Sequence, residues 1–150
     1  MDLDLLLAIT HHLAVFSLVA IFAAEFALLR PGLSGARLGQ LARIDAAYGI
    51  MAVLVLLAGI GRVIFAAKGW DYYASNHAFW GKMGAILVVG LLSVPPTLSI
   101  RRWVKSGGGA ETYAPPPNEL SASRRFVHLQ ALGFLFIPIF AAAMARGYGS

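Results

Sequence analysis

The chain has 150 residues, of which 59% are hydrophobic and only 13% are charged, and its formal net charge is +5. Because about 25% charged residues is usual in soluble proteins, this composition excludes an ordinary soluble domain and indicates an integral membrane protein. The absence of cysteine excludes thiolate metal sites and thiol chemistry. We attribute the positive charge to loops on one side of a bilayer rather than to nucleic-acid binding.

Four long apolar stretches predict membrane-spanning helices, because about 20 apolar residues in a helix cross the hydrocarbon core of a bilayer. Arg30-Pro31-Gly32 ends the first stretch, and Pro95-Pro96 should kink the third. The aromatic connection 70–80 is typical of a membrane surface. The sequence thus predicts an all-α integral membrane four-helix bundle that forms a single domain, residues 1–150. The expected helices are residues 3–29, 41–67, 79–100 and 124–145, with a flexible cytoplasmic loop over 103–123.

Lysine and arginine are distributed unequally between the two ends of this bundle. The first and third connections and the adjacent helix ends carry most of them, which marks the cytoplasmic side. We expect a multi-pass protein of the bacterial inner membrane with both termini on the non-cytoplasmic side. The lipid bilayer is the expected partner, a homo-oligomer is a further expectation, and the start of the chain lacks the basic region of a removable signal peptide. The residues behind this orientation are Arg30, Arg37, Arg43, Arg101, Arg102, Lys105, Arg124 and Arg125.

Polar side chains fall into two layers along the predicted helices when a rise of about 1.5 Å per residue is counted from the helix ends. Such groups either reach the lipid headgroups or line a cavity. In a cavity, Arg62 and Lys82 would hold the carboxylates of an anionic ligand, and they are the candidate catalytic residues. The inner layer contains Glu25, Asp45, Arg43, Arg125 and His128; the outer layer contains Arg62, Lys82, Arg146, Asp2, Asp4 and His77.

Two adjacent histidines, His11 and His12, lie inside the hydrocarbon region of the first helix. His11 borders a face of small residues, where membrane helices approach each other, so it is the better candidate to point inward. An imidazole at this depth would ligate haem iron, relay protons or donate an interhelical hydrogen bond. His11 and His12 are the candidate metal ligands, and Met83 is within about 7 Å of their depth as a second cofactor ligand.

Several motifs together resemble a bacterial membrane family described as domain of unknown function 2214, and the resemblance covers nearly the whole chain. A more distant likeness joins the helix-one histidine, Lys82 and the basic start of the last helix to the HemJ-type protoporphyrinogen IX oxidases and related haem and copper-resistance proteins. That likeness implies haem b on His11 or His12. The motifs are His11-His12 with Glu25, residues 43–49, Gly61-Arg62, residues 79–82, residues 93–97 and residues 144–147.

The first function hypothesis is therefore a membrane-embedded b-type haem or porphyrin-related redox protein. In that role the chain would be a haem-dependent oxidoreductase acting on a porphyrin or a quinone-like small molecule. The alternative is a small transporter or proton/solute pathway lined by intramembrane His, Glu, Asp and Arg. A second alternative is a non-enzymatic membrane assembly subunit, whose small-residue face would pack on another chain.

Overall fold

The computed structural model describes residues 2–65 and 69–149, and in these ranges the regular structure is helical throughout. The elements are α1 (Leu3–Leu28), α2 (Gly35–Phe65), α3 (Gly69–Ala74), α4 (His77–Gly107) and α5 (Pro117–Ala145). All except the short α3 are long and apolar enough to cross a membrane. The prediction of an all-α membrane protein with four spanning helices is therefore confirmed.

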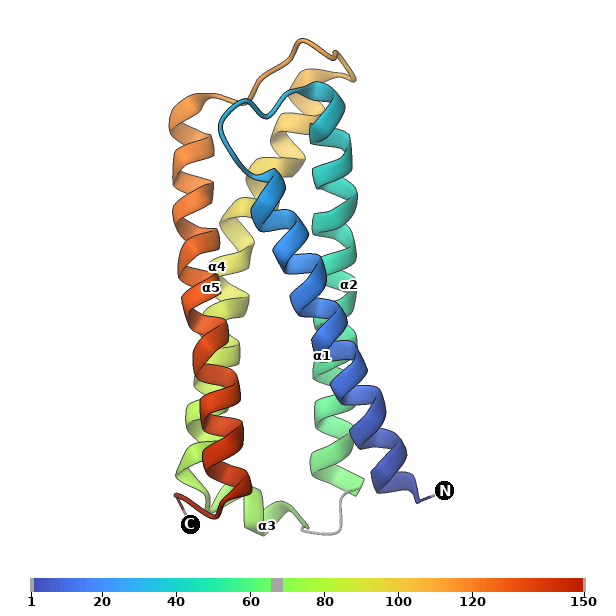
Figure 1. Ribbon diagram of the computed structural model, residues 1–150, viewed down its shortest axis with the longest axis vertical. Helices are drawn as coiled ribbons and strands as arrows, with labels where there is room; N and C mark the ends of the chain where they lie inside the picture. The colour runs from blue at the N-terminus through green and yellow to red at the C-terminus, as the bar shows by residue number, and fades with distance from the viewer. Residues whose placement is uncertain (1, 66–68, 150) are drawn as a thin grey trace.

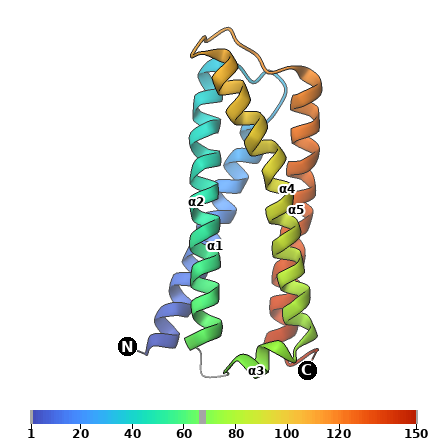
Figure 2. The same ribbon diagram turned by 180° about the vertical axis from the view of Figure 1, so that it is seen from behind.

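The four long helices form two pairs, α1 with α2 and α4 with α5. Figure 1 shows the pairs meeting at one end of the molecule and diverging toward the other, and Figure 2 shows the same from behind. We call the first end, with connections 29–34 and 108–116, the loop end. The opposite end, with α3 and both chain termini, is the terminal end.

The hydrophobic core lies toward the loop end. A continuous cluster of buried side chains joins α1, α2, α4 and α5 there. Many large apolar side chains are exposed on the outer surface of the bundle, among them Phe16 at 72% exposure. This inside-out arrangement is expected when the surrounding solvent is lipid. The cluster contains Leu18, Phe22, Leu29, Leu33, Leu38, Leu41, Tyr48, Ile100, Trp103, Leu120 and Val127.

A bend in α4 brings its last turns into this core. Pro95 and Pro96 lie inside the helix, where each removes a backbone donor and bends the axis. In Figure 2 the part of α4 near the loop end tilts toward α2, whereas the rest runs beside α5. The bend thus allows Ile100 and Trp103 to join a cluster that includes residues of α2.

The bend also explains a buried amide. Because Pro96 has no N–H, the carbonyl of Leu92, four residues earlier, loses its helical partner. The side-chain amide of Gln130 on α5 donates to that carbonyl at 3.3 Å. Gln130 is almost completely buried and also accepts a hydrogen bond from the Tyr48 hydroxyl, at 3.3 Å. One glutamine therefore ties α5 to the bent α4 and to α2.

At the terminal end, a polar cap fixes the start of α4. The Asn76 side chain accepts hydrogen bonds from the backbone N–H groups of Ala78 and Phe79, the usual way to satisfy free donors at a helix start. The N–H of His77 donates to the carbonyl of Gly149 at 2.7 Å, so the C-terminal turn packs against this cap. α3 and its flanking aromatic residues are therefore anchored to both α4 and the end of the chain.

The helices extend beyond the predicted bounds. α2 begins at Gly35 rather than residue 41, α4 covers 77–107 rather than 79–100, and α5 begins at Pro117 rather than residue 124. The predicted loop over 103–123 was wrong in extent, because only 108–116 lies outside helix and Trp103 is buried. Hydropathy marks the part of a helix inside the bilayer, whereas polar turns outside it remain helical. The predicted ends at residues 66 and 67 lie outside the described residues.

Candidate functional site

The two adjacent histidines of α1 have different surroundings. His12 is exposed, and its Nδ1 lies 2.7 Å from the carbonyl oxygen of Ala8, one turn earlier on the same helix. His11 is partly buried, and its Nδ1 has no hydrogen-bond partner of standard geometry. The two rings are nearly perpendicular, with centroids 6.1 Å apart. The inward orientation expected for His11 is thus the one observed, and His12 faces outward.

His11 packs against the backbone of α2 at Gly59. A Cβ added to Gly59 would lie 3.4 Å from His11 Cε1 and 3.8 Å from Nδ1, so the missing side chain makes room for the ring edge. The carbonyl of Val55, one turn earlier on α2, is also close enough to interact with the imidazole. The ring edge that contains Cε1 and Nδ1 therefore lies against α2.

Two cationic side chains from different helices act on His11. Arg62 of α2 and Lys82 of α4 interact electrostatically with the imidazole and with each other. The Nε of Arg62 is buried without a hydrogen-bond partner. Among the described residues, neither cation lies within 4.0 Å of a carboxylate oxygen; the ion pair that these residues form joins Arg102 and Glu119. We call His11, Arg62 and Lys82 the histidine layer, and it presents unpaired positive charge inside the terminal half of the bundle.

Met83 and the other residues predicted for the outer layer lie elsewhere. Met83 is partly buried on α4, but as the neighbour of Lys82 it points about 100° away around the helix. Asp2 caps the start of α1 by accepting a hydrogen bond from the N–H of Asp4, and Arg146 and His77 are exposed near the end of α5 and the start of α4. Of the predicted outer layer, only Arg62 and Lys82 are therefore seen to act on each other and on His11 among the described residues.

The inner layer contains a buried pair of carboxyl groups. Glu25 of α1 is only 3% exposed and Asp45 of α2 is 5% exposed. The two groups interact electrostatically, and each also interacts with Tyr48. Asp45 Oδ1 accepts a hydrogen bond of 2.6 Å from the Thr97 hydroxyl on α4, whereas Glu25 Oε2 is buried without a partner. We call Glu25 and Asp45 the carboxyl pair.

The remaining predicted inner residues do not join this pair. Arg43, Arg125 and His128 are exposed. The His128 ring stacks on Phe26 of α1 with centroids 4.9 Å apart, and its Nδ1 lies 2.6 Å from the carbonyl oxygen of Arg124. Arg125 and His128 instead line a surface hollow of about 620 Å³ on α5, together with Ser121, Arg124, Leu129 and Leu132.

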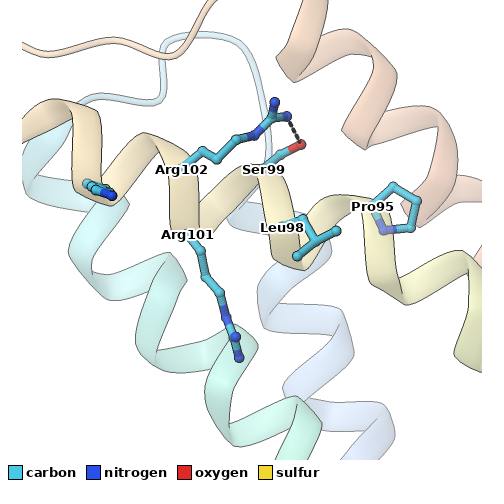
Figure 3. A pocket seen from close by; sticks show the side chains of 6 residues that line it. Pro95, Leu98, Ser99, Arg101 and Arg102 are labelled. Atoms are coloured by element: carbon cyan, nitrogen blue, oxygen red, sulfur yellow. Dashed lines mark hydrogen bonds between the residues drawn. The ribbon is translucent and has the colours of Figure 1, made fainter.

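A second basic hollow, of about 580 Å³, lies on α4 beside its bend. Figure 3 shows Arg101 and Arg102 extending from α4 in different directions, with Arg102 donating to the Ser99 hydroxyl at 3.2 Å. Arg101 also acts electrostatically on Asp45, which links this hollow to the carboxyl pair. The hollow is lined by Pro95, Leu98, Ser99, Arg101, Arg102 and Lys105.

Several residues that complete these sites were missed from the sequence. Gly59 gives His11 its place against α2, and Thr97, Tyr48 and Gln130 surround the carboxyl pair or connect to it. A signal for Gln130 was available, because Pro96 frees a carbonyl that requires a donor from another helix. Gly59 had no comparable signal, since the facing register of two helices is not visible in one sequence.

Comparison with known proteins gives one match. A family model described as "Predicted membrane protein (DUF2214)" matches residues 3–149, almost the whole chain. No curated protein and no solved structure shows significant similarity to this chain.

Proposed function

The chain belongs to the family of predicted membrane proteins DUF2214, and from the geometry of the histidine layer we propose that it is a membrane-embedded redox protein that binds haem b, or a related porphyrin, at that layer. The observation that carries the proposal is the convergence of one imidazole and two unpaired cations from α1, α2 and α4. A porphyrin of this class offers an iron for the imidazole and two carboxylates for the cations.

The histidine of this layer has the surroundings that an axial ligand needs. Metal-binding histidines commonly direct their second nitrogen to a backbone carbonyl or carboxylate, which fixes the ring. In His11 the Nδ1 edge faces the backbone of α2, near Gly59 and the Val55 carbonyl. Nε2 is then the nitrogen that would ligate the iron. When bound, haem would supply one-electron transfer at its iron.

The two cations would hold and tune the ligand. Arg62 and Lys82 would bind the propionates through charge-assisted hydrogen bonds, and the buried Nε of Arg62 would gain the partner it lacks in the protein alone. Their positive charge near the iron would favour its reduced state. Both residues therefore act on affinity and on reduction potential.

An absorption spectrum tests the proposal directly. The detergent-purified protein, or the colourless protein titrated with haemin, should show a Soret band that is lost in His11→Ala. His12→Ala is the matched control, because it removes an adjacent imidazole that is exposed, and it should leave the band unchanged. Arg62→Gln and Lys82→Gln should each weaken haemin binding roughly 10- to 100-fold, the equivalent of one hydrogen bond to a charged group. Protein that stays colourless and does not bind haemin would refute the proposal.

We also propose that the chain lies in the bacterial inner membrane with its loop end in the cytoplasm, which would place the histidine layer in the outer half of the bilayer. The excess of arginine at the loop end supports this orientation. Because the chain has no cysteine, single cysteines can report it in whole cells. An impermeant maleimide should label Asp71→Cys on α3 and leave Glu111→Cys unlabelled until the cells are opened; the reverse pattern would overturn the orientation.

A further inference from the structure

Glu25 is a buried carboxyl group that forms no ion pair with any of the described residues. It lies near the end of α1, 3% exposed, and its Oε2 contacts no hydrogen-bond donor. An ionised carboxylate in an apolar environment is strongly unfavourable unless it is paired and hydrogen-bonded. Its immediate neighbours on α1 that face the core, Phe22 and Leu18, are apolar. The group therefore needs a partner that the described residues do not supply.

The nearest charged group that acts on Glu25 is a second carboxyl. Asp45 is itself 5% exposed, and it accepts a hydrogen bond from the neutral hydroxyl of Thr97. Two carboxylates held close together in a buried site repel each other, and a shared proton or a bound cation removes that repulsion. Each of the two helices therefore contributes a buried carboxyl group without a positively charged partner among the described residues.

The other groups that act on the pair do not neutralise it. Tyr48 of α2 interacts with both carboxyls, and α5 contributes the uncharged Gln130, which accepts from Tyr48. Arg101 of α4 acts on Asp45 from a distance but forms no ion pair with it among the described residues. His128 of α5 is exposed and stacks on Phe26.

We propose that Glu25 and Asp45 form a binding site for one monovalent cation, taken up either as a proton shared by the two carboxyls or as Na⁺. Carboxylate and hydroxyl oxygens are the ligands of hard cations. The described residues hold no group of three or more His, Asp or Glu side chains that would suit a divalent metal. The site goes beyond the proposed haem function, because Glu25 lies about 21 Å along α1 from His11.

Chemical labelling distinguishes the occupants. Dicyclohexylcarbodiimide is an apolar reagent that adds to protonated carboxyl groups. The product is an O-acylisourea, which rearranges to a stable N-acylurea with the acyl group on a nitrogen of the reagent, so the adduct retains the mass of the whole reagent. The full-length protein in detergent would be treated in choline chloride buffer at a series of pH values and analysed by peptide mass spectrometry. The expected result is a pH-dependent adduct on Glu25 or Asp45 that is lost in the double variant Glu25→Gln, Asp45→Asn.

Matched samples complete the test. Glu119→Gln removes a carboxyl at the same end of the bundle that already has Trp103 and Arg102 as partners, and it should leave the adduct unchanged. Replacing choline by Na⁺ should suppress labelling if the site takes Na⁺, and suppression would be absent if the pair binds only a proton. Labelling of neither residue at any pH, in protein whose helical circular dichroism is intact, would overturn the proposal.

A stability measurement keeps the proposal testable if the reagent fails to enter. Removing the need for a cation should make the Glu25→Gln, Asp45→Asn protein at least as stable as the parent in choline buffer. Its thermal midpoint should also be independent of Na⁺ and less dependent on pH than that of the parent. A double variant that unfolds at lower temperature and keeps the parent's pH dependence would contradict the site.

Discussion

The loop end and the terminal end of this bundle are built from the same four helices but have different polar chemistry. At the loop end several buried polar side chains join different helices: Trp103 donates to Glu119 at 2.8 Å, and Gln130 connects α5 to α2 and α4. At the terminal end, the histidine layer holds an imidazole and a guanidinium with buried, unpartnered nitrogens. The loop end is therefore the more closely packed end, and within it the carboxyl pair is the exception whose charge is not compensated.

The difference in packing has a physical basis. The bend at Pro95 and Pro96 brings the end of α4 toward α2 and closes the loop end around Trp103. The same bend leaves the two helix pairs diverging toward the terminal end, as Figures 1 and 2 show. Outside the carboxyl pair, substitutions at the loop end should therefore act mainly on stability, whereas those in the histidine layer should act mainly on ligand binding.

The largest loss of stability is expected from Trp103→Ala. Trp103 is 1% exposed, so its removal leaves a large cavity and takes one hydrogen bond from Glu119 Oε2. The cost should be about 3 to 5 kcal/mol, measured by reversible unfolding in mixed detergent. Trp70→Ala, at the terminal end and 56% exposed, is the control and should cost within about 0.5 kcal/mol. Equal losses of stability at the two tryptophans would contradict the view that the loop end is the more important for stability.

A smaller loss of stability is expected at the start of α2, which touches the connection between α4 and α5. A Cβ on Gly35 would collide with the backbone carbonyl of Ala110, which belongs to the connection between α4 and α5. Backbone cannot move aside as a side-chain tip can, so Gly35→Ala should cost about 1 to 3 kcal/mol. Gly39→Ala, on the same helix with nothing within 4 Å of the new Cβ, should instead gain up to about 1 kcal/mol from helix propensity.

The sequence alone predicted what depends on composition and helix geometry. It indicated the membrane class and the four helices, and it favoured His11 over His12 as the inward histidine, because apolar runs and about 100° per residue are local properties. It failed where register between helices decides the outcome. Arg125 and His128 were grouped with Glu25 on depth alone, yet they lie on the outer surface of α5. Depth is readable from a sequence, whereas direction within the bundle requires the packing.

A still smaller loss of stability is expected when the hydrogen bonds of Gln130, which connects three helices, are removed. Tyr48→Phe removes its hydrogen bond from Tyr48, and Gln130→Leu also removes the donor to the Leu92 carbonyl. Interhelical hydrogen bonds in membranes contribute about 0.6 kcal/mol on average and up to about 1.7. Tyr48→Phe should therefore cost less than Gln130→Leu in the same unfolding assay. In the double variant the cost of Tyr48→Phe should vanish, and additive costs would show that the two side chains act independently.

The smallest change in stability, with the sharpest consequence for the site, is expected for Gly59→Ala. The new Cβ would lie 3.4 Å from His11 Cε1, a close contact whose cost roughly offsets the helix propensity gained, so the net should be within about 0.5 kcal/mol. The displaced imidazole should nevertheless shift or weaken the Soret band of haemin-titrated protein. Gly49→Ala, with nothing within 4 Å, is the control that leaves the band unchanged. Because α2 backbone is what fixes the His11 ring, an unchanged band in Gly59→Ala would mean that the iron ligand, if any, is held elsewhere.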